Sequence, residues 1–138
     1  MVKQLSAQQV QTLIRQGVPQ AEELDLRVVE IGADYAIACV PFQAKAVRPG
    51  GTVSGPTQMA LADAAMYALV MGALGAGQMA VTSQLNINFL QKPLAADLLA
   101  KAKLLRLGSK QAVCQVELYS QGAPETCVAF VTGTYSLN

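Results

Sequence analysis

Residues 54–76 read SGPTQMALADAAMYALVMGALGA, and this stretch decides the fold. Apolar side chains occupy nearly every helical face of it, which is typical of a helix that is buried almost all round. We expect the helix to span Pro56–Ala76, with Ser54 capping its first turn. Its most apolar part, Met59–Ala76, contains Asp63 and is shorter than the ~20 residues that a bilayer span needs. The stretch therefore predicts the core helix of a soluble domain.

Strands are expected on both sides of this helix, because runs of alternating or β-branched apolar residues end at Gly, Pro or Asn/Asp turns. A short amphipathic helix, Ser6–Gln16, precedes them. The expected strands span Leu24–Ile31, Tyr35–Val40, Val81–Phe89, Leu98–Leu107, residues 112–118 and Thr126–Leu137. The later connections are too short for crossovers and favour antiparallel hairpins. The pattern predicts an α+β fold, a curved antiparallel sheet of five to six strands wrapped around one long buried helix.

Length and composition narrow the class of protein. The 138 residues fit a single domain, 1–138, in which residues 1–20 form an N-terminal helical extension. With 52% hydrophobic and 14% charged residues, the chain is too apolar for disorder, and we expect part of its surface to be buried in a homo-oligomer. The net charge of +1 argues against nucleic-acid binding. Three cysteines without a CxxC pair, and no apolar segment near the start, predict a cytoplasmic protein without membrane insertion.

The sequence contains no histidine, and this restricts the possible chemistry. Ser-His-Asp and Cys-His nucleophile systems, HExxH metal sites and any histidine general base are excluded. Catalysis by this chain must use carboxylates, hydroxyls, backbone dipoles or cationic side chains. No metal site and no cofactor is expected.

Asp63 is the main candidate for a catalytic residue. It is the only acidic residue between Tyr35 and Ala96, and it lies in the most apolar helix. A carboxylate there is costly unless it is paired, hydrogen-bonded or faces a wet cleft. Of its neighbours one helical turn away, only Tyr67 can donate a hydrogen bond. The alternative is a structural carboxylate that caps backbone groups or bonds a Ser or Thr on the sheet.

The start of the same helix, Ser54-Gly55-Pro56, is a second candidate site. A helix N-terminus offers unpaired N–H groups and the positive end of the dipole, so it can polarise a carbonyl oxygen. Asp63 lies eight residues after Gly55, roughly 12 Å along a helix. One carbonyl cannot reach both groups of the same chain. If both serve one site, two subunits must supply them.

Residues 92–110 carry five cationic side chains and one acid, Asp97. This run indicates either a patch that binds a phosphorylated ligand or an edge strand protected by lysines. Arg106 and Lys110 are the candidates to hold the nucleotide part of such a ligand.

From about Leu24 to its end, the chain resembles the hotdog-fold thioesterases, and within them the group of the phenylacetate-degradation (PaaI-like) thioesterase. That group has a His-Gly-Gly loop followed by Leu-Ala-Asp on the central helix. Ser54-Gly55-Pro56 and Leu61-Ala62-Asp63 stand at these places. Asn88-Phe89-Leu90 before Pro93 and the Arg106-Leu107-Gly108 turn match further family patterns. Here Ser54 replaces the family's His and Arg48 its loop amide.

The resemblance implies hydrolysis of an acyl-CoA thioester, with Asp63 as general base or nucleophile. The N–H of Gly55 would bind the thioester carbonyl across a dimer interface, and Thr82 would assist, with Ser83 as the alternative. Arg48, Ser54 and Tyr67 are further candidates for substrate binding.

We expect a homodimer at minimum and a homotetramer as the assembly, acting on a small or medium acyl-CoA, aromatic acyl groups included. CoA would enter only as part of the substrate. Two alternatives remain at this point. One is a non-catalytic protein that binds acyl-CoA or an apolar metabolite, and the other is a structural oligomer in which Asp63 is a satisfied core carboxylate.

Overall fold

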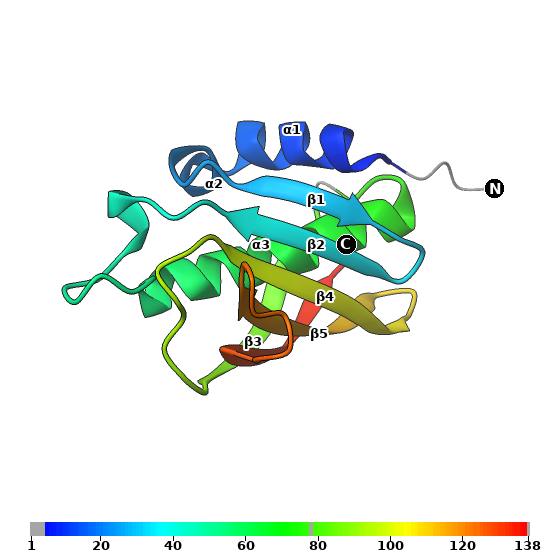
Figure 1. The fold of residues 1–138 in the computed structure, drawn as a ribbon. Coiled ribbons are helices and arrows are strands. Elements are labelled where there is room, and N and C mark those ends of the chain that lie inside the picture. The colour runs from blue at the N-terminus through cyan, green and yellow to red at the C-terminus, as the bar shows by residue number, and fades with distance from the viewer. Residues whose placement is uncertain (1–4, 78, 138) are drawn as a thin grey trace.

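One long helix, α3 (Gly55–Leu74), packs against a six-stranded antiparallel sheet in the computed structural model, which describes residues 5–77 and 79–137 (Figure 1). The expected hotdog fold, an α+β sheet wrapped around a buried helix, is confirmed. The strands are β1 (Arg27–Ile31), β2 (Tyr35–Val40), β3 (Val81–Phe89), β4 (Leu98–Leu107), β5 (Gln111–Ser120) and β6 (Ala129–Ser136).

The strand order is β1-β2-β4-β5-β6-β3, and every neighbouring pair is antiparallel. The expected hairpins β4–β5 and β5–β6 are confirmed. β3, however, pairs with β6 and not with β4, because residues 90–97 carry the chain past two strands before β4 begins. β3 is thus an edge strand, whereas β4 is central. The proposal that lysines protect β4 as an edge strand is therefore wrong.

The helix α3 forms the core with the inner face of the sheet. Leu61, Met66 and Leu69 are at most 1% exposed, and burying each such side chain stabilises the fold by about 1.5–3 kcal/mol. Gly133 on β6 lets the helix approach closely, since a Cβ there would lie 2.5 Å from Met66 Sδ. By length and composition α3 could cross a bilayer, but 61% of its apolar window is buried inside this fold.

The N-terminal extension is longer than expected. Helix α1 (Ala7–Gly17) begins at the expected cap, Ser6, whose side chain accepts from the N–H of Gln9. A second helix, α2 (Pro19–Glu23), follows, so β1 begins three residues after the expected Leu24. Both helices lie along the β1 side of the molecule (Figure 1). A 3-10 turn, η1 (Ala44–Ala46), lies between β2 and α3.

Candidate active site

The carboxylate of Asp63 is held by two hydroxyl groups of the sheet. The hydroxyl of Thr82 on β3 donates to Oδ1 at 2.7 Å, and the phenol of Tyr135 on β6 lies 2.7 Å from the same oxygen. The phenol is also 3.1 Å from the backbone carbonyl of Asp63. Within the described part of the chain, no residue donates to the second oxygen, Oδ2. One oxygen is therefore anchored, and the other is available to a water or a substrate.

Tyr135 serves as a donor and not as a base. Its side chain is buried, and burial, followed by the charge of Asp63, raises the pKa of the phenol well above its usual range. Because the phenol stays protonated at neutral pH, it can donate a hydrogen bond to the carboxylate. The ring of Tyr67 stacks on it, with centroids 5.8 Å apart and planes at 16°. Tyr67, expected to bind substrate, thus also supports the position of Tyr135.

Thr82 reaches Asp63 because of a β-bulge. Strict alternation along Val81–Phe89 predicts that Thr82 points away from Leu85 and Ile87, the side chains that pack on the core. The register shifts between Thr82 and Gln84, which reverses the alternation and turns Thr82 toward α3. Ser83, the alternative to Thr82, donates instead to the backbone carbonyl of Thr134 at 3.2 Å.

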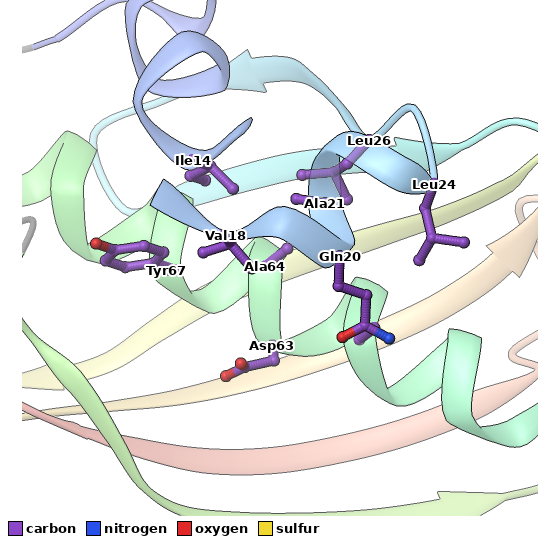
Figure 2. A pocket seen from close by; sticks show the side chains of 10 residues that line it. Ile14, Val18, Gln20, Ala21, Leu24, Leu26, Asp63, Ala64 and Tyr67 are labelled. Carbon is purple, nitrogen blue, oxygen red and sulfur yellow. The ribbon is translucent and has the colours of Figure 1, made fainter. Parts of the chain in front are cut away.

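Asp63 lies where two hollows meet. The outer groove, about 430 Å³, is lined by Pro56, Met59, Ala60, Thr82 and Leu85 among others, and is open to solvent. The inner pocket, about 60 Å³, lies between the N-terminal helices and α3. Its walls include Ile14, Val18, Ala21, Leu26, Ala64 and Tyr67, and Figure 2 shows Asp63 beneath α2 beside them. Because Gln20, Ala60 and Asp63 line both hollows, the groove and the pocket adjoin at the carboxylate.

Gly55 belongs to a different hollow, together with Arg48. These two residues line a pocket of about 330 Å³ with Gln58, Phe89 and Lys92, and Asp63 is not part of it. No described residue accepts from the N–H of Gly55, which begins α3. The structure thus separates Gly55 from Asp63 within one chain, as the helix rise predicted.

Ser54 caps α3, since its Oγ accepts from the N–H of Thr57 at 3.3 Å. It lines a fourth hollow with Lys45 and Pro56. Arg106 and Lys110 come together at the β4–β5 turn, in a surface pocket of about 320 Å³. That turn lies near the start of β3, because Gln111 pairs with Ser136, and Ser136 pairs with Val81. Arg48 with Gly55, Ser54, and Arg106 with Lys110 therefore lie in three hollows apart from Asp63, and of the expected residues only Thr82 and Tyr67 lie in a hollow with it.

Sequence reasoning missed Tyr135, the second donor to Asp63. Its position has a signal, because Ala129, Val131 and Gly133 precede it at alternate positions and are small. A large polar ring at the end of an inward-facing row of small residues must face the helix.

A buried helix, an antiparallel sheet curved around it and a carboxylate on that helix at the mouth of an apolar pocket define a hotdog-type thioesterase. The family model of the thioesterase superfamily matches residues 50–127, and the chain belongs to this superfamily. As a member of this superfamily, the protein is a thioester hydrolase. Among curated proteins, no match to the sequence was found.

Solved structures agree with this assignment. A proposed thioesterase from a Silicibacter species is 33% identical, with a TM-score of 0.85 over 99% of this chain and 95% of its own. A variant of the phenylacetic acid degradation protein PaaI from Thermus thermophilus is 28% identical, with a TM-score of 0.73 over 87% and 99%. The PaaI protein of the E. coli phenylacetic acid degradation operon, at 22% identity, shares the fold with a TM-score of 0.80 over 96% and 93%.

Proposed function

We propose that this protein hydrolyses an acyl-CoA thioester to a free acid and CoA. The observation that carries the proposal is the carboxylate of Asp63, which is anchored through Oδ1, has no donor to Oδ2 among the described residues, and lies where an open groove adjoins a mostly apolar pocket. An acyl-CoA matches this site, because it has a large polar carrier on one side of the reacting carbon and an apolar acyl group on the other.

Asp63 acts as the general base. Oδ2 takes a proton from a water as the oxygen of that water attacks the thioester carbon. Negative charge then develops on the carbonyl oxygen, and the N–H of Gly55 of the partner subunit stabilises it. The tetrahedral intermediate collapses with cleavage of the C–S bond, and the proton passes from Asp63 to the departing sulfur. Thr82 and Tyr135 keep the carboxylate in place throughout. The products are a carboxylic acid and CoA, and no metal or organic cofactor takes part.

The free edge of β3 supports a site shared by two subunits. Thr82, near the start of β3, contacts Asp63, whereas Phe89, at its end, lies beside Gly55, with 3.4 Å between its ring and an ideal Gly55 Cβ. A second copy added antiparallel to this edge, with its two-fold axis near Leu85, places the start of β3 beside the end of the partner's β3. Gly55 of the partner subunit then comes close to Asp63. Both ends of β3 are more than half exposed, at 58% for Val81 and 52% for Phe89, so pairing also buries apolar surface.

Complementation between subunits tests this shared site. Gly55→Pro removes one N–H at a helix position that accepts proline, and Gly55→Ala is the matched control that keeps it. We expect Gly55→Pro and Asp63→Asn to be inactive alone. In a randomly mixed population, half of the dimers are mixed and each has one intact site, so activity returns to about a quarter of wild type. Mixtures that stay inactive, although mixed dimers form, would reject the shared site.

Arg106 and Lys110 are proposed to hold the phosphates of CoA, because their turn lies two strands from Thr82 at the same end of the sheet. The homotetramer is proposed as a pair of such dimers.

A panel of acyl-CoA thioesters, with free thiol as the readout, tests the proposed function as a whole. We expect release of CoA thiol by wild type that is faster than the uncatalysed rate by several orders of magnitude. Tight binding of an acyl-CoA in a calorimeter without thiol release would instead identify a non-catalytic binding protein.

A further inference from the structure

The inner pocket has mostly apolar walls, and its polar lining residues are Gln20, Asp63 and Tyr67. Its far wall is made by Ile14, Leu24 and Leu26, which are 1%, 7% and 1% exposed and belong to the hydrophobic core. Deepening the pocket would therefore require displacement of core side chains. Two small residues, Ala21 on α2 and Ala64 on α3, leave the space that the pocket occupies.

The charge of the pocket also discriminates between acyl groups. Among the described residues that line it, none is cationic, and Asp63 stands at its entrance. A carboxylate at the far end of an acyl group would have to pass the negative charge of Asp63 and lose its hydration where the described donors, Gln20 and Tyr67, are uncharged, which is costly. The pocket thus favours an uncharged acyl group.

The wall formed by α2 is held in place by side chains outside the pocket. Arg15 on α1 donates through Nε to Glu22 and through Nη1 to Asp25, each at 2.7 Å. Gln43 Nε2 donates to the carbonyl of Leu24 at 2.7 Å. These contacts hold the C-terminal end of α2 against α1 and against the segment that precedes α3, so they limit how far this wall of the pocket can move.

We propose that the inner pocket receives the far end of the acyl group, and that the N-terminal helices limit the substrate to short, uncharged, apolar acyl-CoA thioesters. This inference rests on the proposed function and deepens it. Val18, between α1 and α2, and Ala64, on α3, line the pocket and are the residues at which its size can be changed. Each methylene group that enters the pocket raises kcat/KM about fourfold until the far wall is reached.

The test measures kcat/KM for acetyl-, butanoyl-, hexanoyl- and octanoyl-CoA with wild type and three variants. We expect a wild-type optimum at or below hexanoyl-CoA. Ala64→Leu fills the pocket and shifts the optimum to a shorter chain. Val18→Ala opens it and shifts the optimum to a longer one. Ala73→Leu makes the same change on α3 as Ala64→Leu but outside both the pocket and the groove, so its profile matches wild type.

A matched substrate pair tests the charge. Succinyl-CoA has the same number of acyl carbons as butanoyl-CoA but ends in a carboxylate, and we expect its kcat/KM to be at least tenfold lower. Melting temperatures establish that each variant is folded. If Ala64→Leu does not fold, Val18→Ala still decides the matter, because Val18 is 36% exposed and loses only two methyl groups.

The possible failures are distinct. An active enzyme whose length profile is identical in wild type, Ala64→Leu and Val18→Ala would overturn the pocket assignment and leave the thioesterase proposal standing. An active enzyme that hydrolyses succinyl-CoA as fast as butanoyl-CoA would do the same. Wild type that releases no thiol from any acyl-CoA would overturn the proposed function itself.

Discussion

Replacement of Asp63 by Asn removes the proposed base while it keeps the shape of the side chain. The amide oxygen can still accept from Thr82 and Tyr135, whose hydroxyls are both 2.7 Å from Oδ1 in the wild type. The amide nitrogen replaces Oδ2 and cannot take a proton. Two charge-assisted hydrogen bonds become neutral ones, which costs about 1 kcal/mol each at most. A positioned general base contributes roughly 10²–10⁴ in rate, so we expect kcat to fall by at least 100-fold.

The assay is thiol release from the best substrate of the panel, with kcat and KM determined separately and folding followed by thermal denaturation. KM should change little, because the acyl pocket and the CoA contacts remain. Asp34→Asn, at an exposed carboxylate in the turn between β1 and β2, is the matched control and should keep full activity. A folded Asp63→Asn enzyme with kcat within tenfold of wild type would refute the role of Asp63 as base and leave it a structural carboxylate.

Two further predictions concern stability. The Arg15 hydrogen bonds lower the pKa of Asp25 and of Glu22 from their ordinary values of 3.8 and 4.5, so this network stabilises the fold above about pH 4 and stops doing so as pH falls through the lowered values. Arg15→Met should therefore lower Tm at pH 7, with a gap to wild type that narrows in acid, and a gap independent of pH would contradict the argument. Gly133→Val should cost about 1–3 kcal/mol in the free energy of unfolding by urea, because its Cβ would lie 2.5 Å from Met66 Sδ and 3.2 Å from the carbonyl of Gln84; an unchanged or higher value would show that the helix can move away.

Long periodic segments were predictable from the sequence. The bounds of β2, β3 and β4 agree with the expected strands, and α3 differs from the expected helix by one residue at its start and two at its end. In these elements, apolar spacing, turn residues and caps all indicate the same secondary structure, and tertiary packing does not change it. The helix α2 was missed because five residues are too few to show a helical period. Its first residue, Pro19, is typical of the first turn of a helix. One proline does not establish a helix, however, unless further turns with helical apolar spacing follow it.

The site was predictable where a single residue conflicts with its surroundings. Asp63 stands out as the only charge of an apolar helix, and the helix rise alone separates it from Gly55. The donors that hold Asp63 could not be found in this way, because they depend on strand register. Tyr135 lies 72 residues away in sequence and reaches Asp63 from β6, and Thr82 reaches it because β3 pairs with β6. Pairing between distant strands has no local signal.

The bulge at Ser83 determines which way the side chain of Thr82 points. With strict alternation, Thr82 would share a face with Gln84 and point away from α3, and Asp63 would lose one of its two donors. The shift instead pairs Thr82 with Tyr135, whose side chain faces the core, so that both hydroxyls converge on one carboxylate oxygen. A single added residue in an edge strand is tolerated, since no second strand of the same chain must follow the kink. The intramolecular sheet ends at β3, where a bulge is tolerated, and the shift of register that it brings gives Asp63 its second donor.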